Sequence, residues 1–257
     1  MVQAPTISKS CRGLHHAPRY DGVMNRTRKA LKPGYESLTT DKAYILGVLC
    51  GDGCLPRRGR TFQVRACDED FVLKVQESIS NVYGFQPSMC REQPKDACWH
   101  RTQILVTACS TTMVDDLRGY GPHMTKDWSV PDAIFEADAS VKAAWLRGFY
   151  DSEGYVQNPP KTIAKTCVQA TTTNTRGMGE VLALLSTMGI SARINVYSPK
   201  QGEIATITIG GYARISLFAR LVNFTIARKR ERLAAIVARY EARGATPTPS
   251  TSTPEGA

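Results

Sequence analysis

Long apolar runs and paired cysteines are both missing from this chain of 257 residues. No stretch approaches the roughly 18 consecutive apolar residues that a membrane-spanning helix needs, so we expect no membrane partner. The eight cysteines form no C-x-x-C pair and have no regular spacing, which argues against a zinc module and against a secreted disulfide framework. They are typical of reduced thiols. The expected location is therefore intracellular, in the cytoplasm of a prokaryote or in an organelle.

Acidic residues are scarce relative to basic ones. The chain has 23 Asp and Glu residues against 33 Lys and Arg residues, which gives a net charge of +10. A protein of this charge attracts polyanions, so nucleic acid is the default partner. The length is sufficient for one large hydrophobic core or two small ones.

Two short segments repeat one pattern. Leu46 to Gly53 reads L-G-V-L-C-G-D-G, and Leu146 to Gly154 reads L-R-G-F-Y-D-S-E-G. Each segment has an early glycine, a small residue four positions later, an acid and a final glycine. The early glycines, Gly47 and Gly148, lie one compact half-domain apart. This spacing predicts an internal duplication with two similar halves.

Each repeated segment is predicted to be a buried helix that ends at its acid, because it is apolar on nearly all sides. The small residues four positions apart would let the two helices pack closer than the usual 8–10 Å or so. Gly53 and Gly154 suit left-handed C-terminal caps. Asp52 and Glu153 would then lie side by side at the negative ends of two helix dipoles, where they repel unless a cation joins them. Mg²⁺ takes such oxygen ligands and completes its shell with water and phosphate.

The two segments resemble the paired signature of the LAGLIDADG homing endonucleases, in the monomeric form that has two motifs. The resemblance covers roughly residues 38–240 and implies an α+β fold. Its two pseudo-symmetric αββαββα halves would form a saddle of antiparallel sheets over DNA, with the motif helices packed at the interface. The catalytic acid of the family precedes the last glycine, here Asp52 and Glu153. The earlier acid of the signature is Cys50 in one copy and Asp151 in the other, a departure at a position that does not bind the metal in the family.

The resemblance also implies an activity, which is site-specific cleavage of double-stranded DNA by an intron-encoded monomer. The site would be long and non-palindromic, and hydrolysis of the phosphodiester would be Mg²⁺-dependent and leave short 3′ overhangs. Asp52 and Glu153 would share the metal, and the predicted metal site includes the preceding residues Gly51 and Ser152. Mn²⁺ is expected to substitute, whereas Ca²⁺ is expected to bind without supporting cleavage.

Alternation with period two follows the first motif. It places Phe62 and Val64 on one face of a strand, and Gln63 and Arg65 on the other. An outward Arg and Gln face suits readout of the major groove; the alternative is a half-exposed strand with solvated polar residues. The predicted DNA contacts on such strands and their loops are Arg57, Arg58, Arg60, Gln63, Arg65, Arg101, Gln103, Lys161, Lys165, Gln169, Arg193, Asn195 and Tyr197.

The motif helices are expected to begin at Thr39 or Thr40 and near Ser140, which are suitable N-caps. In the last hairpin, Ile194 and Val196 are expected to face inward. Helical periodicity predicts further helices over residues 68–84, 111–120, 178–188, 212–222 and 228–244.

Five segments are predicted. Residues 1–37 form a flexible basic arm, 38–120 the first half, 121–139 a linker, 140–244 the second half and 245–257 a disordered tail rich in Pro, Thr and Ser.

The family uses central lysines to hold solvent and polarise the phosphate. Lys95 and Lys165 are the predicted catalytic lysines here. The charge run over residues 228–232 is interpreted mainly as a solvated helix face, with phosphate contact as the alternative.

Two other functions fit the same fold. An intron maturase would bind its own intron RNA through the basic surface and keep the two acids as structural residues. A DNA-binding regulator would have kept the fold and lost cleavage. Because both motif acids are present, the endonuclease is the preferred hypothesis. A complete intein is not expected, since the chain neither begins with Cys or Ser nor ends in Asn.

Overall fold

The computed structural model describes residues 30–56, 59–93, 102–159, 162–198 and 202–244. From Leu31 onward the described residues belong to one compact unit. The predicted tail and the first 29 residues of the predicted arm lie outside the described part. No helix within that part is long and apolar enough to cross a membrane.

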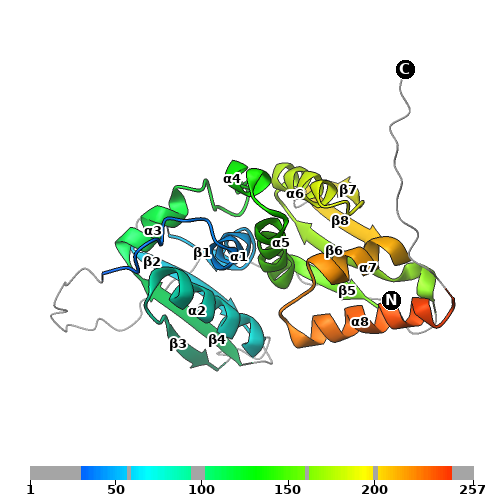
Figure 1. Cartoon of the computed structure of the whole chain (residues 1–257), viewed down its shortest axis with the longest axis horizontal. Helices are drawn as coiled ribbons and strands as arrows, with labels where there is room; N and C mark the ends of the chain where they lie inside the picture. Colours follow the sequence, from blue (N-terminus) through cyan, green and yellow to red (C-terminus); the bar gives the residue numbers. More distant parts are fainter. Residues whose placement is uncertain (1–29, 57–58, 94–101, 160–161, 199–201, 245–257) are drawn as a thin grey trace, which may run out of the picture. The chain divides into compact units, whose positions relative to one another are not determined.

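The first half is built from three helices and a four-stranded sheet (Figure 1). The sheet is antiparallel throughout and has the order β1-β2-β4-β3. Along the chain the elements are α1 (Thr40–Leu49), β1 (Gly53–Cys54), β2 (Thr61–Ala66), α2 (Glu69–Tyr83), β3 (Ser88–Glu92), β4 (Gln103–Cys109) and α3 (Thr111–Arg118).

The second half repeats this plan. Its antiparallel sheet has the order β5-β6-β8-β7, the counterpart of the first. Its elements are α5 (Ala139–Glu153), β5 (Gly154–Gln157), the 3-10 helix η1 (Ile163–Lys165), β6 (Cys167–Thr172), α6 (Thr175–Thr187), β7 (Arg193–Tyr197), β8 (Ile204–Gly210), α7 (Tyr212–Leu221) and α8 (Ala227–Glu241). The predicted α+β architecture of two αββαββα halves is confirmed.

Local sequence signals explain where several helices begin and end. The side chain of Thr39 accepts a hydrogen bond from the Lys42 amide at the start of α1, which is the predicted N-cap. Gly84 ends α2 with φ of 77°. Helix α5 begins next to the predicted Ser140, but Ser140 is not its N-cap. Asp138 occupies the N-cap position and the helix begins at Ala139.

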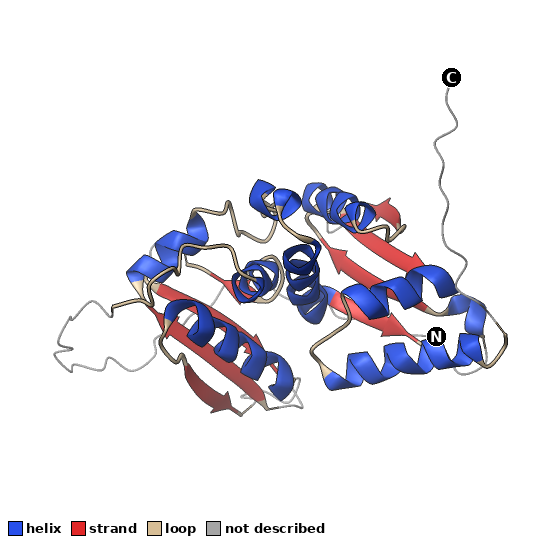
Figure 2. Ribbon diagram, viewed as in Figure 1, coloured by secondary structure: helices blue, strands red, loops and turns tan. Residues whose placement is uncertain are grey.

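Strand alternation separates the two faces of each sheet, and helices cover one face (Figure 2). Phe62 and Val64 of β2 are buried, whereas Gln63 and Arg65 are not, as the alternation predicted. Val196 is an exception, because 52% of it is exposed instead of facing the core. It lies near the end of β7, which is the edge strand of its sheet, so no strand pairs with it on the outer side.

One segment boundary differs from the prediction, and one predicted segment contains a helix. Residues 31–37 were assigned to the arm, but Leu31 and Tyr35 pack against the core and the Lys32 amide donates to the carbonyl of Tyr83. Part of that segment therefore belongs to the first half. The predicted linker contains a helix, α4 (Asp132–Glu136), preceded by the buried Trp128.

The two motif helices, α1 and α5, pack against each other (Figure 1). A methyl group on Gly47 would overlap the carbonyl oxygen of Trp145, and one on Gly148 would overlap that of Tyr44. Only glycine permits this backbone approach. The predicted close seam between the motif helices is therefore present, and it brings the ends of the two helices together.

Candidate metal centre and nucleic-acid interface

The two motif acids lie at the end of the helix seam. Glu153 is the last residue of α5, and Asp52 lies in the turn between α1 and β1. Asp52 is exposed and Glu153 is partly exposed. Directly before them, Gly51 and Ser152 are in close contact, so that a methyl group on Gly51 would overlap the β-carbon of Ser152. The seam thus holds the segments that carry both acids against each other.

The glycines after the acids do not form left-handed caps, which corrects the prediction. Neither Gly53 nor Gly154 has a positive φ, and each begins a strand. Their need for glycine is steric. A methyl group on Gly154 would overlap the carbonyl oxygen of Tyr150, and one on Gly53 would lie 2.8 Å from the α-carbon of Leu49. The chain leaves each helix so close to its last turn that a side chain does not fit.

Asp52 influences the protonation of Glu153. Burial, followed by the negative charge of Asp52, raises the pKa of Glu153 to about 8. Burial raises the pKa of Asp52 to about 6; Lys229 opposes this shift and Asp68 adds to it. At neutral pH the pair therefore retains about one proton, which a bound cation would displace.

The donor set fits a hard divalent cation that brings its own remaining ligands. Within the described ranges there is no group of three or more His, Cys, Asp or Glu residues able to hold a metal. Two carboxylates with like charge need a cation but leave most of its shell to water and phosphate, as Mg²⁺ prefers. The Ser152 hydroxyl donates to the carbonyl of Gly148, 3.1 Å away, within its own helix. Its side chain is therefore already engaged, and Gly51 has only backbone atoms to offer.

A buried lysine that the sequence analysis missed lies beside the acids. Lys229 of α8 is 6% exposed, and its ammonium donates to the carbonyl oxygens of Asp151 (2.6 Å) and Tyr150 (3.1 Å). Burial lowers its pKa to about 8. A signal was present in the charge run, because Lys229 shares a helical face with the buried Leu233 and Ile236 at the i, i+4 and i+7 positions.

This lysine opens onto a pocket of about 300 Å³ that Asp52 also lines. Ser152, Asp68 and Arg228 contribute to the same pocket. A negative group and a positive group thus share one cavity at the end of the seam, where a metal and a phosphate would both find partners.

The two lysines that the sequence analysis proposed are not shown at this centre. Lys95 lies outside the described residues. Lys165 is exposed in η1. Gly154 pairs with Ala170 at the acid end of β5, whereas Lys165 precedes β6 beyond the opposite end of the strand. The register therefore places Lys165 towards the opposite end of β5 from Glu153, and its catalytic role stays a prediction that this arrangement does not support.

Asp151, the earlier acid of the second motif, joins three elements. It is 2% exposed and accepts hydrogen bonds from the Tyr44 hydroxyl (2.9 Å) and from the amides of Thr225 (2.9 Å) and Ile226 (3.4 Å). Those amides precede α8, which carries Lys229. The Asp151 carboxylate is thus committed to holding the start of that helix, not to a metal.

Each half also holds a helix start of the other. From α2 of the first half, Asp70 accepts from the amide of Ala227 at the start of α8, and Asp68 forms two hydrogen bonds of 2.6 and 2.7 Å with Arg228. From α6 of the second half, Glu180 accepts from the amide of Val130, just before α4 (2.8 Å). The contacts of Asp68 and Asp70 attach α8, the helix that carries Lys229, to the first half.

The predicted DNA-contact residues fall into three groups. Arg57, Arg58, Arg101 and Lys161 lie outside the described residues, and Lys165 is in η1 and not on a strand. The exposed Arg60 immediately precedes β2. The remaining ones share the outward faces of the two sheets by register and are Gln63, Arg65 and Gln103 in the first half, and Gln169, Arg193, Asn195 and Tyr197 in the second.

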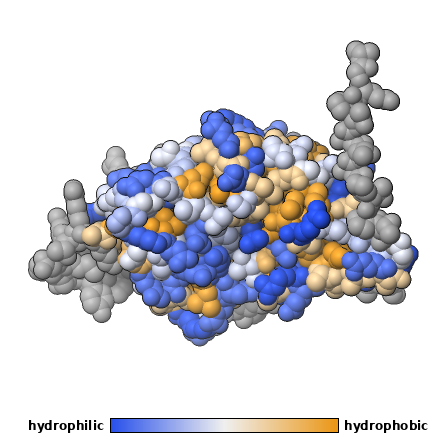
Figure 3. All heavy atoms as spheres, in the orientation of Figure 1, coloured by the Kyte–Doolittle hydropathy of each residue, from blue (hydrophilic) through white to orange (hydrophobic). Residues whose placement is uncertain are grey.

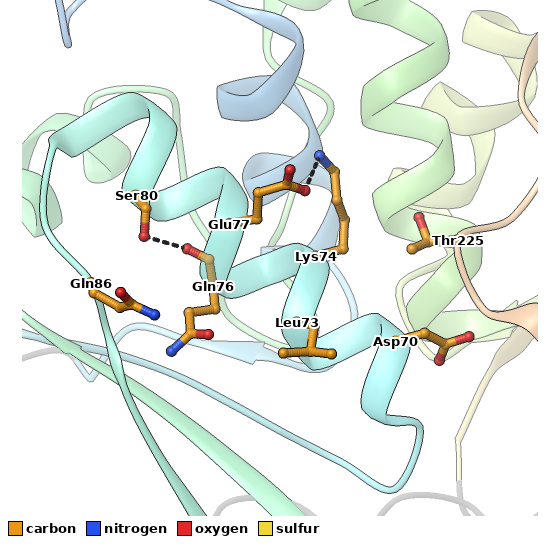
Figure 4. A pocket seen from close by; sticks show the side chains of 8 residues that line it. All are labelled: Asp70, Leu73, Lys74, Gln76, Glu77, Ser80, Gln86 and Thr225. Carbon is orange, nitrogen blue, oxygen red and sulfur yellow. Dashed lines mark hydrogen bonds and ion pairs between the residues drawn. The ribbon is translucent and has the colours of Figure 1, made fainter.

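Another pocket, of about 640 Å³, lies between α2 and Thr225 (Figure 4). Its charged side chains are already paired, since Lys74 contacts Glu77 at 2.9 Å and Asp41 at 3.1 Å. On the face seen in Figure 3, hydrophilic residues predominate around α2 and hydrophobic patches are exposed over the second half. We therefore do not assign the metal or phosphate to this pocket.

The chain is similar in sequence and in structure to known proteins. Residues 140–223 match the family described as LAGLIDADG-like domain. The homing endonuclease I-DmoI, solved in complex with DNA and Ca, superimposes with a TM-score of 0.52 at 14% identity, over 77% of this chain and 98% of its own. The chain has the LAGLIDADG fold.

The same LAGLIDADG fold superimposes on full-length WhiA from "Thermatoga maritima" with a TM-score of 0.53 at 15% identity, over 80% of this chain and 64% of the other. Among curated sequences, the ribonucleoside-diphosphate reductase NrdEB subunit alpha of Bacillus subtilis is 26% identical over 186 residues, 66% of this chain. The chain spans only 16% of that relative's length.

Proposed function

We propose that this LAGLIDADG protein is a site-specific, metal-dependent endonuclease acting on double-stranded DNA inside the cell. The observation that carries the proposal is the pair Asp52 and Glu153, held together at the end of a glycine-lined seam. Their raised pKa values describe a pair poised to exchange a proton for a cation.

Different residues of the chain would have different roles in phosphodiester hydrolysis. Asp52 and Glu153 would hold the cation, expected to be Mg²⁺, with Mn²⁺ as a substitute. When bound, it would activate water and stabilise the leaving oxygen. Lys229 lines the same pocket as Asp52, so its positive charge would attract the scissile phosphate. Asp151 and Asp70 hold the start of α8 and thereby orient Lys229.

The two outward sheet faces support the choice of a long duplex as substrate. Each carries Gln and Arg side chains, which hydrogen-bond to base edges in the major groove. Because the residues on the two faces differ, the site would be non-palindromic. One chain supplies both faces, so the proposed enzyme acts as a monomer. Cuts leaving short 3′ overhangs and an origin in an intron belong to the same proposal.

An intron maturase of the same fold remains the second candidate, with the chain's own intron RNA as partner. The basic composition favours it equally, but the pair of motif acids has no catalytic role in it. A maturase would therefore keep its function after Asp52→Asn.

The test is to incubate the purified chain with genomic DNA in Mg²⁺ and, separately, in Ca²⁺, and to sequence the new DNA ends. Recurrent ends are expected in Mg²⁺ only. They should disappear with Asp52→Asn and persist with Glu136→Gln, a matched change at an exposed acid of α4. Absence of new ends in Mg²⁺, together with tight binding of structured RNA, would instead establish the maturase.

A further inference from the structure

The outward faces of the two sheets differ in chemistry, although their strand order is the same. The face of the first sheet carries an ion pair, whereas the face of the second carries hydroxyl groups paired with each other or with an amide. This difference bears on which base pairs each face would read.

On the first sheet, the guanidinium of Arg65 bonds the carboxylate of Glu92 at 2.9 Å. The two side chains are 47% and 39% exposed, so they remain accessible to a ligand. In the major groove, guanine presents two acceptors, which suit arginine, and its partner cytosine presents an amino donor, which suits glutamate. An adjacent Arg and Glu therefore complement both edges of one G·C pair.

On the second sheet, β6 and β8 place threonines opposite each other. The hydroxyls of Thr171 and Thr206 lie 2.9 Å apart, and the Gln169 amide donates to the Thr208 hydroxyl at 3.1 Å. Each of these hydrogen bonds occupies only part of a hydroxyl's capacity, and each threonine also carries a methyl group that can make apolar contact. The thymine methyl group is the base feature that threonine methyl groups contact in the major groove.

Uncharged polar residues also lie next to Thr171, Thr206 and Thr208, which we call the threonine ladder. Asn195 of β7 pairs with Thr206 in the register, and asparagine suits adenine. Tyr155 of β5 is 52% exposed beside Gln169. Among the outward positions of the described strands of this sheet, Arg193 is the charged residue, and it lies at the start of the edge strand.

We infer that the two half-sites differ in base composition. The half over the first sheet contains a G·C pair read by Arg65 together with Glu92. The half over the second sheet is rich in A·T pairs, read by the threonine ladder and Asn195. This inference rests on the proposed function, because it names the duplex that the same protein would bind.

The experiment is selection of random-sequence duplexes by the cleavage-deficient Asp52→Asn chain in Ca²⁺, followed by sequencing of the bound pool. The expected consensus has one A·T-rich half and one half with a fixed G·C pair. Arg65→Gln should relax that pair by about ten-fold in affinity ratio and leave the A·T-rich half unchanged.

A matched pair of variants tests the threonine ladder. Thr171→Val keeps a methyl group and removes the hydroxyl, so the preference for thymine should persist. Thr171→Ser keeps the hydroxyl and removes the methyl group, so the preference should weaken by about five-fold. The opposite ranking would show that the hydroxyl reads the base, and it would overturn this part of the inference.

The outcomes separate the inference from the proposed function. A consensus whose halves have equal composition, or a preference unaffected by Arg65→Gln, would overturn the inference while the DNA-binding function stands. No enriched duplex at all, with RNA bound by the same protein, would remove the proposed function itself.

Discussion

The two copies of the motif share a backbone but not a set of polar residues. In the second copy, Asp151 accepts from the amides that precede α8, and Lys229 is the third residue of that helix. In the first copy, Cys50 takes the place of the acid and donates to the carbonyl of Leu46. Ile134, fully buried, is the third residue of the corresponding helix α4.

The missing acid of the first copy is replaced from elsewhere. Glu180, which belongs to the second half, accepts from the amide of Val130 ahead of α4. The corresponding amide ahead of α8 is that of Thr225, held by Asp151. A duplicated scaffold can thus keep both helix starts while only one copy keeps its own acid. The buried lysine, in contrast, has no replacement in α4.

The largest expected effect concerns the motif acids, Asp52 and Glu153, which both copies retain. Asp52→Asn and Glu153→Gln should each lower the cleavage rate by at least about 1,000-fold, because each removes a charged metal ligand. DNA affinity in Ca²⁺ at low salt should change little, since phosphate contacts by Lys and Arg dominate it. Single-turnover cleavage of a plasmid and a binding titration would measure the two quantities. Loss of DNA binding in both variants would show that the acids are structural.

The helix seam is the other feature common to both copies. Gly47→Ala and Gly148→Ala should each lower the free energy of unfolding by roughly 3 kcal/mol or more, because the added methyl group overlaps a carbonyl oxygen of the opposite helix. Gly179→Ala in α6 is the matched control, since its methyl group would meet nothing within 4 Å. The control should be neutral or stabilising by up to about 1 kcal/mol in urea unfolding. Equal midpoints for all three would contradict the close seam.

Lys229 has no counterpart in α4, so its substitution tests the difference between the two copies. Lys229→Met should slow cleavage by about 10- to 100-fold, because the pocket loses a positive charge. It should also lower the free energy of unfolding by about 1–3 kcal/mol, because the carbonyls of Tyr150 and Asp151 lose their donor. Wild-type protein should cut its two strands at unequal rates, and the variant should bring those rates together. Duplexes labelled differently on each strand would show this on a denaturing gel. An unchanged rate on both strands would exclude Lys229 from catalysis.

Asp151 and Cys50 occupy the same position in the two copies, so their substitutions should differ. Asp151→Asn should cost about 1–3 kcal/mol of unfolding free energy, because it weakens the hydrogen bonds at the start of α8. Cys50→Ala should cost less than about 1 kcal/mol, since the thiol makes a single weak bond. Urea midpoints would rank them, and the reverse order would remove the proposed role of Asp151.

The smallest effect concerns pH. The pKa of Glu153 in the folded protein is about 8, above that of a free carboxyl, so the metal-free protein gains stability from its protonated form at low pH and loses it as pH rises towards 8. A cation must displace the proton of Glu153, so its affinity should rise with pH between about 6 and 8, by at most about ten-fold per unit. The increase in Tm caused by Ca²⁺, followed across pH, measures this. It should become flatter in Glu153→Gln.

Much of the fold follows from local signals. The alternation of Phe62, Gln63 and Val64 assigned both faces of β2, and the spacing of Gly47 and Gly148 predicted the seam. These features depend on periodicity and on steric size, which neighbouring residues in the sequence determine.

Other features could not be read in this way. Gly53 and Gly154 were predicted to adopt a left-handed conformation. Glycine is required there because the preceding helix lies too close for a side chain. Lys229 was one cation in a charged run, and its burial depends on α5, whose carbonyl oxygens lie far away in sequence. The roles of Asp70 and Glu180 depend on contacts between halves that no local pattern encodes.

The exchange of helix starts between the halves also constrains how this chain can evolve. Asp70 in one copy holds α8 in the other, and Glu180 holds the segment before α4 in return. A substitution at either of these positions therefore changes contacts in both copies. The two copies, once identical in this view, have to diverge together, and neither carries by itself all the information needed to build a complete half.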